Sequence, residues 1–201
     1  MSDFKPFFTP QQRATIEAAM ARIIPSGDSP GAKEAGTVDF VDRYLSGIDY
    51  IYAKPDGSGF ETLVGIPAVS WTKRIAVLQQ TYLAGIDLLE SKSQSKHQSG
   101  FADLTAEQQD AILTDIERPD GEDGSDEAPA LQQTNAEIDL KFFPLLCLHT
   151  RQGFYADPIY GGNQNRIGWD HIGFPGPRSL KDVHTGGSFT ALPWFAEGHN
   201  K

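Results

Sequence analysis

Apolar residues recur at steps of three and four through most of the chain, the spacing that places them on one face of an α-helix. The pattern is clearest from Val69 to Leu89, where one predicted face carries Ile75, Leu78, Tyr82, Ile86 and Leu89. Alternation of apolar and polar residues, which is typical of a half-buried strand, never extends beyond four or five positions. We therefore predict a mostly α fold.

Residues that favour helix ends indicate the limits of the first helix. Thr9, followed by Pro10 and then Gln12, matches the capping box, in which the first and fourth residues bond each other's backbone N–H groups. Pro25 is unable to continue a helix because it lacks a backbone N–H. We predict a helix over residues 9–24.

The same signals place two further helices. Thr37 follows a glycine and is predicted to cap a second helix, and Thr105 with Gln108 forms another capping box. Residues 91–99 are polar, so we predict a loop between the long helix and the one that starts at Thr105.

Two later segments are harder to assign. Residues 119–129 hold five acidic residues and no basic one, which predicts a solvated loop, and they lack the ligand order of a calcium loop. A helix is predicted from Asn135 onward. Pro144 lies inside it and must either kink the helix or mark a second start.

Gly153 to Gly176 is the least regular and most aromatic part of the sequence. Its 24 positions hold six glycines, two prolines and five aromatic residues, with neither a helical nor a strand period. Such a segment is too aromatic for a linker, and long ordered loops are usually functional. We predict a single domain made of a helical body (9–152), an ordered loop (153–177) and an extended C-terminal arm (178–201). A lid over the domain's own core is the alternative for the loop.

Size and charge limit the classes of function. The 201 residues suffice for one well-buried domain, and 39% hydrophobic with 22% charged residues is ordinary for a globular protein. A net charge of −10 argues against nucleic acid, whose phosphates require clustered Lys and Arg. It also disfavours an anionic membrane surface, and the longest apolar runs are too short to span a bilayer, so no direct membrane insertion is expected.

The N-terminal residues and the cysteine content bear on compartment and cofactors. No basic segment followed by an apolar one opens the sequence, so a signal peptide is not predicted. A cytoplasmic protein and a sequence that begins at a mature start both remain open. The single cysteine, Cys147, lies in an apolar run and is predicted to be a buried thiol, which leaves this chain without an internal disulfide or a four-cysteine iron–sulfur site.

Groups that could perform chemistry gather late in the chain: His149, Tyr155, Asp157, Tyr160, Asp170, His171 and His184. Metal sites need three or four convergent ligands, and no HxxxH or HExxH spacing is present. The simplest interpretation has Asp157 bonding N–H groups of its own loop and His149 capping a helix C-terminus. No dinucleotide, P-loop or nucleophile-elbow motif occurs.

Two blocks of the sequence resemble the gluconate 2-dehydrogenase subunit 3 family. The first is FTPQQRATIEAAMARIIPSGDSPGAKEAGTVDFVDRYL, and the second, more specific one is GFYADPIYGGNQNRIGWDHIGFPGP. The resemblance implies a helical small (gamma) subunit with no cofactor of its own. Its partner would be a large FAD-dependent dehydrogenase subunit of the glucose–methanol–choline (GMC) type that oxidises a sugar or polyol, with a cytochrome c subunit as a further candidate partner.

The resemblance also implies a role in maturation or export of the partner, often by means of a twin-arginine signal on one of the two subunits. This sequence shows no such leader. We expect a periplasmic location if the chain is exported with its partner or begins at its mature start, and a cytoplasmic location as the alternative.

An irregular loop rich in aromatic residues is typical of an interface core, where such side chains contribute most of the binding energy. The predicted partner-binding residues are therefore Tyr155, Asp157, Pro158, Tyr160, Gly161, Gly162, Asn163, Trp169, Phe174, Trp194 and Phe195. Catalytic, cofactor-binding and metal residues are not predicted. The alternative is a small-molecule binding or catalytic domain that uses Tyr155, Asp157 and His171.

Overall fold

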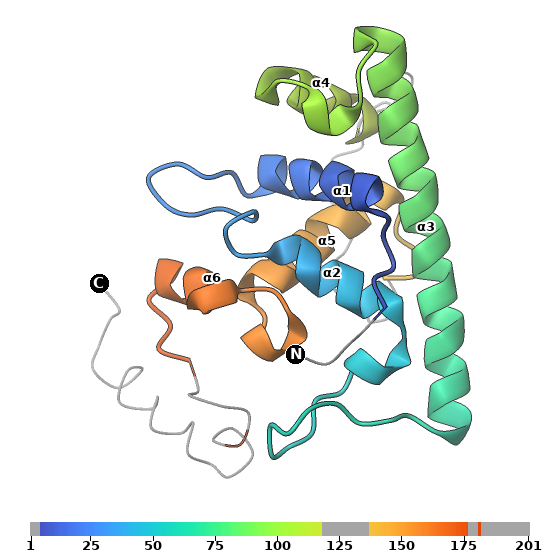
Figure 1. Cartoon of the computed structure of the whole chain (residues 1–201), viewed down its shortest axis with the longest axis vertical. Helices are drawn as coiled ribbons and strands as arrows, with labels where there is room; N and C mark the ends of the chain where they lie inside the picture. The colour runs from blue at the N-terminus through green and yellow to red at the C-terminus, as the bar shows by residue number, and fades with distance from the viewer. Residues whose placement is uncertain (1–4, 118–136, 177–180, 182–201) are drawn as a thin grey trace.

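The computed structural model describes residues 5–117, 137–176 and 181, and these residues are mostly helical, as predicted (Figure 1). In the described ranges β structure is limited to one bridge, between Ala53 and Phe60. The α-helices are α1 (Pro10–Ile23), α2 (Thr37–Ser46), α3 (Gly65–His97), α4 (Ala106–Glu117), α5 (Phe142–Tyr155) and α6 (Ile167–His171). Short 3-10 turns are η1 (Ile48–Tyr50), η2 (Phe101–Asp103), η3 (Pro158–Tyr160) and η4 (Gln164–Arg166).

Helix α5 lies at the centre and contacts α1, α2, α3 and α4. Helix α3 runs along one edge of the molecule, from α4 at one end to the segment before Gly65 at the other (Figure 1). At 33 residues it is about 50 Å long. The predicted inner face of this helix is buried in the common core, since Ile75, Leu78, Tyr82, Ile86 and Leu89 are all at most 4% exposed.

The first helix has the predicted start. The Thr9 hydroxyl accepts from the Gln12 N–H at 3.3 Å, and the Gln12 side chain accepts from the Thr9 N–H at 3.0 Å, which completes the capping box. The pair Thr105 and Gln108 makes the same two bonds before α4. These local predictions are confirmed.

The predicted cap of α2 is wrong. Gly36 is the residue that precedes the helix, with φ 62°, and Thr37 is the first helical residue. The buried Thr37 hydroxyl has no hydrogen-bond partner among the described residues. Glycine is needed at position 36 because φ is positive there and because a Cβ would overlap the Gln164 side chain.

Helix α3 extends beyond both predicted ends, so the predicted loop over 91–99 is wrong for residues 91–97. Pro67 is accommodated because it lies in the first turn, where N–H groups have no helical acceptor. At the other end, buried Ser93 bonds the Leu89 carbonyl and Lys96 pairs with Asp115 of α4. The burial of Ser93 and the ion pair between Lys96 and α4 are the tertiary contacts of this polar part of the helix.

Of the two alternatives for Pro144, the second start is correct. Helix α5 begins at Phe142, and Pro144 lies in its first turn, where it causes no kink. Residues 137–141, predicted as helix, lie outside any helix and include a turn at residues 137–139. The acidic loop over 119–129 and, apart from Lys181, the arm over 178–201 lie outside the described residues.

The segment 153–176 is ordered, but it is not a plain loop. Its first three residues end α5, and η3, η4 and α6 follow. Positive φ angles at Gly161, Asn163, Asn165 and Arg166 separate these pieces, because a positive φ cannot continue a right-handed helix.

Candidate functional site

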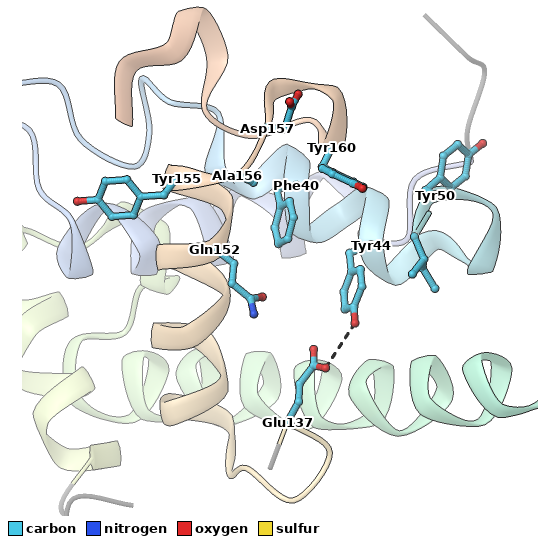
Figure 2. Close-up of a pocket in the computed structure, with 10 residues that line it drawn as sticks. Phe40, Tyr44, Tyr50, Glu137, Gln152, Tyr155, Ala156, Asp157 and Tyr160 are labelled. Carbon is cyan, nitrogen blue, oxygen red and sulfur yellow. Dashed lines mark hydrogen bonds between the residues drawn. The ribbon is translucent and has the colours of Figure 1, made fainter. Parts of the chain in front are cut away.

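A surface pocket lies between α2, α5 and the turn around η3 (Figure 2). It has a volume of about 490 Å³. Five of its wall residues are aromatic and two are acidic. The wall consists of Phe40, Tyr44, Tyr50, Ile51, Glu137, Gln152, Tyr155, Ala156, Asp157 and Tyr160.

Helix α2 provides the apolar wall. Phe40 and Tyr44 are four residues apart, one helical turn, so their side chains emerge from the same face. Their rings are nearly parallel, with centroids 6.0 Å apart. Figure 2 shows both rings projecting from α2 toward Glu137, with Gln152 of α5 on the other side.

Glu137 closes the pocket opposite α2 and is held by three side chains. Its Oε1 lies 2.7 Å from His149 Nε2, and its Oε2 accepts from Arg74 Nε at 2.9 Å and from the Tyr44 hydroxyl at 3.4 Å. Burial alone would raise the pKa of Glu137, but the bonds and charges of His149 and Arg74 outweigh burial and lower it. The carboxylate is thus kept ionised although its side chain is only 11% exposed.

The prediction that His149 caps a helix C-terminus is wrong. This residue lies inside α5, is fully buried, and its Nδ1 is 2.9 Å from the Tyr82 hydroxyl. Tyr82, His149 and Glu137 therefore form a chain of hydrogen bonds. Because the imidazole of His149 is fully buried, these hydrogen bonds act by positioning the Glu137 carboxylate at the pocket wall.

Three predicted residues, Tyr155, Asp157 and Tyr160, do line the pocket. Asp157 Oδ1 accepts from the Ile159 N–H at 3.0 Å, which confirms that its side chain bonds its own turn. Pro158 is the first residue of η3. Gly161 closes that turn with φ 103°.

Two other residues that were predicted to bind the partner, Asn163 and Gly162, are buried. Asn163 is fully buried, and its amide donates to the Ala156 carbonyl and accepts from the Gly168 N–H, both at 2.8 Å. Gly162 is buried where a Cβ would overlap the Gly153 carbonyl. These residues hold the segment against α5.

Trp169 is also buried by residues of this chain. The residue is 6% exposed, and its Nε1–H donates to the Tyr155 carbonyl at 2.7 Å. Phe174 packs edge-on against it, with centroids 5.4 Å apart. Trp194 and Phe195 lie outside the described residues.

The alternative trio of Tyr155, Asp157 and His171 does not surround one cavity. Asp157 lines the pocket with Glu137, whereas His171 lines a second cavity of about 470 Å³, and Tyr155 borders both. Cys147 also lines the second cavity and is only half-buried, so the prediction of a buried thiol is wrong, although partial burial still raises the pKa of the thiol. Within the described ranges no three His, Cys, Asp or Glu side chains are placed to share a metal ion.

Sequence reasoning missed the contribution of Phe40, Tyr50 and Glu137 to this site. The four-residue step from Phe40 to Tyr44 was a usable signal for a shared helix face. The pairing of Glu137 with Arg74 joins residues that are 63 positions apart, and no local pattern reports it.

The model of the gluconate 2-dehydrogenase subunit 3 family matches residues 10–176 of the chain. Because the match covers most of the chain, the protein belongs to this family. The family name describes a subunit of a dehydrogenase complex, which implies partner subunits. Neither a curated protein nor a solved structure matches the chain.

The helices of the described ranges were also checked for membrane spans. None combines the length and the apolar character needed to cross a bilayer.

Proposed function

We propose that this chain is a non-catalytic small subunit that binds and stabilises an FAD-dependent catalytic subunit of the GMC type, which oxidises a sugar or polyol. Family membership supports a place in a dehydrogenase complex. The observation that carries the binding role is the open, aromatic-walled pocket between α2 and α5.

The pocket has the properties of a site for a partner's side chain. Aromatic residues are enriched in interface cores because each buries a large apolar area at low entropic cost. The Glu137 carboxylate already accepts hydrogen bonds from His149, Arg74 and Tyr44. Its burial by a partner would therefore not leave an unpaired charge. An apolar or aromatic side chain of the partner would therefore gain burial here without a large desolvation cost.

In this proposal the FAD is held by the partner, and this chain contributes no cofactor. Binding to the native catalytic subunit stabilises it by mass action, which is a physical basis for a role in maturation or export. A periplasmic location and a cytochrome c subunit as electron acceptor belong to the same proposal.

The test is co-expression of the tagged chain with the flavoprotein of its own complex. The complex is expected to show flavin absorbance and dye-linked sugar oxidation, and the isolated chain neither. Oxidation by the isolated chain at a rate comparable to the complex would refute the non-catalytic assignment. Failure of the flavoprotein to co-purify would refute the binding role.

A variant pair tests the pocket itself. Tyr160→Ala removes one aromatic wall and should weaken association by about 2 kcal/mol, roughly a 30-fold rise in Kd. Ile172→Ala is the matched control, because Ile172 is exposed and lies away from the pocket. Equal Kd values for the two variants would show that the pocket does not contact the partner.

A further inference from the structure

The side of helix α3 that the described body leaves uncovered carries exposed apolar residues among polar ones such as Ser70, Lys73 and Gln80. Ile66 is 82% exposed and Val69 56% exposed, and Val77 follows Ile66 by eleven residues, about three helical turns, on the same side. Most of the exposed large apolar side chains in the described ranges belong to α3 or the residue before it: Val64, Ile66, Val69, Val77, Leu83 and Leu88.

A groove crosses the N-terminal half of this exposed side. It has a volume of about 330 Å³ and is lined by Ser70, Trp71, Lys73, Arg74, Val77 and Ile138. The edge of the Tyr52 ring packs against Trp71 with centroids 5.8 Å apart, which extends the apolar surface beyond the helix. We call this surface, made of Ile66, Val69, Val77, Tyr52 and Ile138, the outer α3 face.

The outer α3 face adjoins the aromatic pocket. Arg74 lines the groove and bonds Glu137, which closes the pocket. Ile138 of the groove directly follows Glu137, and Tyr52 directly follows Ile51 of the pocket wall. One partner can therefore cover both surfaces at once.

We propose that the outer α3 face is a second docking surface for the catalytic subunit, continuous with the pocket and occupied by an apolar segment of that subunit. This inference rests on the proposed function and identifies the surface that performs it. Exposed apolar patches of this kind mark protein–protein contacts.

Two antiparallel arrangements of a second copy of the chain fit this surface poorly. In a two-fold antiparallel pair centred on the middle of α3, Ile66 would face the exposed Lys96 of the second copy, and Val69 would face its polar C-terminal turns. A pair centred near Val69 would leave Val77 beyond the end of the other helix. Each copy also carries a net charge of −10, which opposes self-association.

The test uses a double variant, Ile66→Glu with Val69→Glu, in the full chain co-expressed with the flavoprotein. The matched control is Gln94→Glu with Ser95→Glu, which adds the same charge at exposed polar positions near the C-terminal end of the same helix, away from the groove. We expect the Kd for the flavoprotein to rise at least 30-fold in the first variant and less than threefold in the control. The melting temperature of the chain alone should match between the two.

The outcomes separate the two proposals. If wild-type chain captures the flavoprotein and the Ile66/Val69 variant binds equally well, the outer α3 face is not the docking surface and the proposed function stands. If wild-type chain captures no flavoprotein, both proposals fail. A wild-type chain that is dimeric by light scattering, with a monomeric Ile66/Val69 variant that still binds the flavoprotein normally, would assign the face to self-association and overturn the inference.

Discussion

Replacement of Trp169 by alanine distinguishes an indole that stabilises this chain from one that contacts a partner. The structure places the residue in the interior, 6% exposed, with its Nε1–H bonded to the Tyr155 carbonyl. Gly176 packs so close to the indole that an added Cβ would overlap the ring. Removing the side chain therefore opens a cavity that neighbouring groups already enclose.

The expected cost follows from this burial. Trp→Ala changes in protein interiors cost about 3–5 kcal/mol. For a chain of this size each kcal/mol lowers the melting temperature by about 2–4 °C, so a drop of roughly 6–20 °C is expected. Trp169→Phe keeps most of the volume but leaves the Tyr155 carbonyl without its donor, and should cost about 1–3 kcal/mol.

Thermal unfolding of the isolated chain, followed by circular dichroism, measures both effects. Trp71→Ala is a suitable control, because Trp71 is only half-buried and its contact with the Arg74 guanidinium, 5.2 Å from the ring centroid, contributes about 0.5–1 kcal/mol. If Trp169→Ala melts within a few degrees of wild type but no longer binds the flavoprotein, the burial argument is refuted and Trp169 is an interface residue.

Three other changes test the packing and electrostatics. The bond to His149 helps lower the folded-state pKa of Glu137 below its ordinary 4.5, so its contribution to stability is present above pH 4.5 and is lost as the pH falls through the folded-state value. Glu137→Gln should therefore reduce the loss of melting temperature that accompanies a fall in pH. If the melting temperature of the variant depends on pH as that of wild type does, the proposed contribution of Glu137 is contradicted. Asp157→Ala should cost about 0.5–2 kcal/mol in denaturant titrations through loss of the turn bond, while Asp157→Asn retains most of it; equal losses would contradict the capping role. Gly85→Ala should destabilise by about 1–3 kcal/mol because its Cβ would overlap the Phe142 ring, although alanine is the better helix former, and a stabilised variant would show that this contact relaxes freely.

The candidate site was only partly predictable. Tyr155, Asp157 and Tyr160 were singled out because a Gly- and aromatic-rich segment has no regular period, and all three line the pocket. The same reasoning selected Asn163 and Trp169, which are buried against α5. Composition identifies a segment with special geometry, but it does not report which side chains of that segment face inward.

The sequence by itself determined the properties that depend on residues close to one another along the chain. The apolar period of α3 located its inner face, and the capping box at Thr9 located the start of α1. Both signals act between residues within about one or two helical turns, so the local sequence contains all the information.

Only the tertiary structure decided which surfaces are covered. The apolar residues of the outer α3 face stay exposed because the described body packs on the opposite side of the helix. Glu137 becomes part of the pocket only where α3 brings Arg74 and α5 brings His149 to it. Burial and charge pairing depend on contacts between residues that are distant in the chain, and such contacts leave no periodic signal in the sequence.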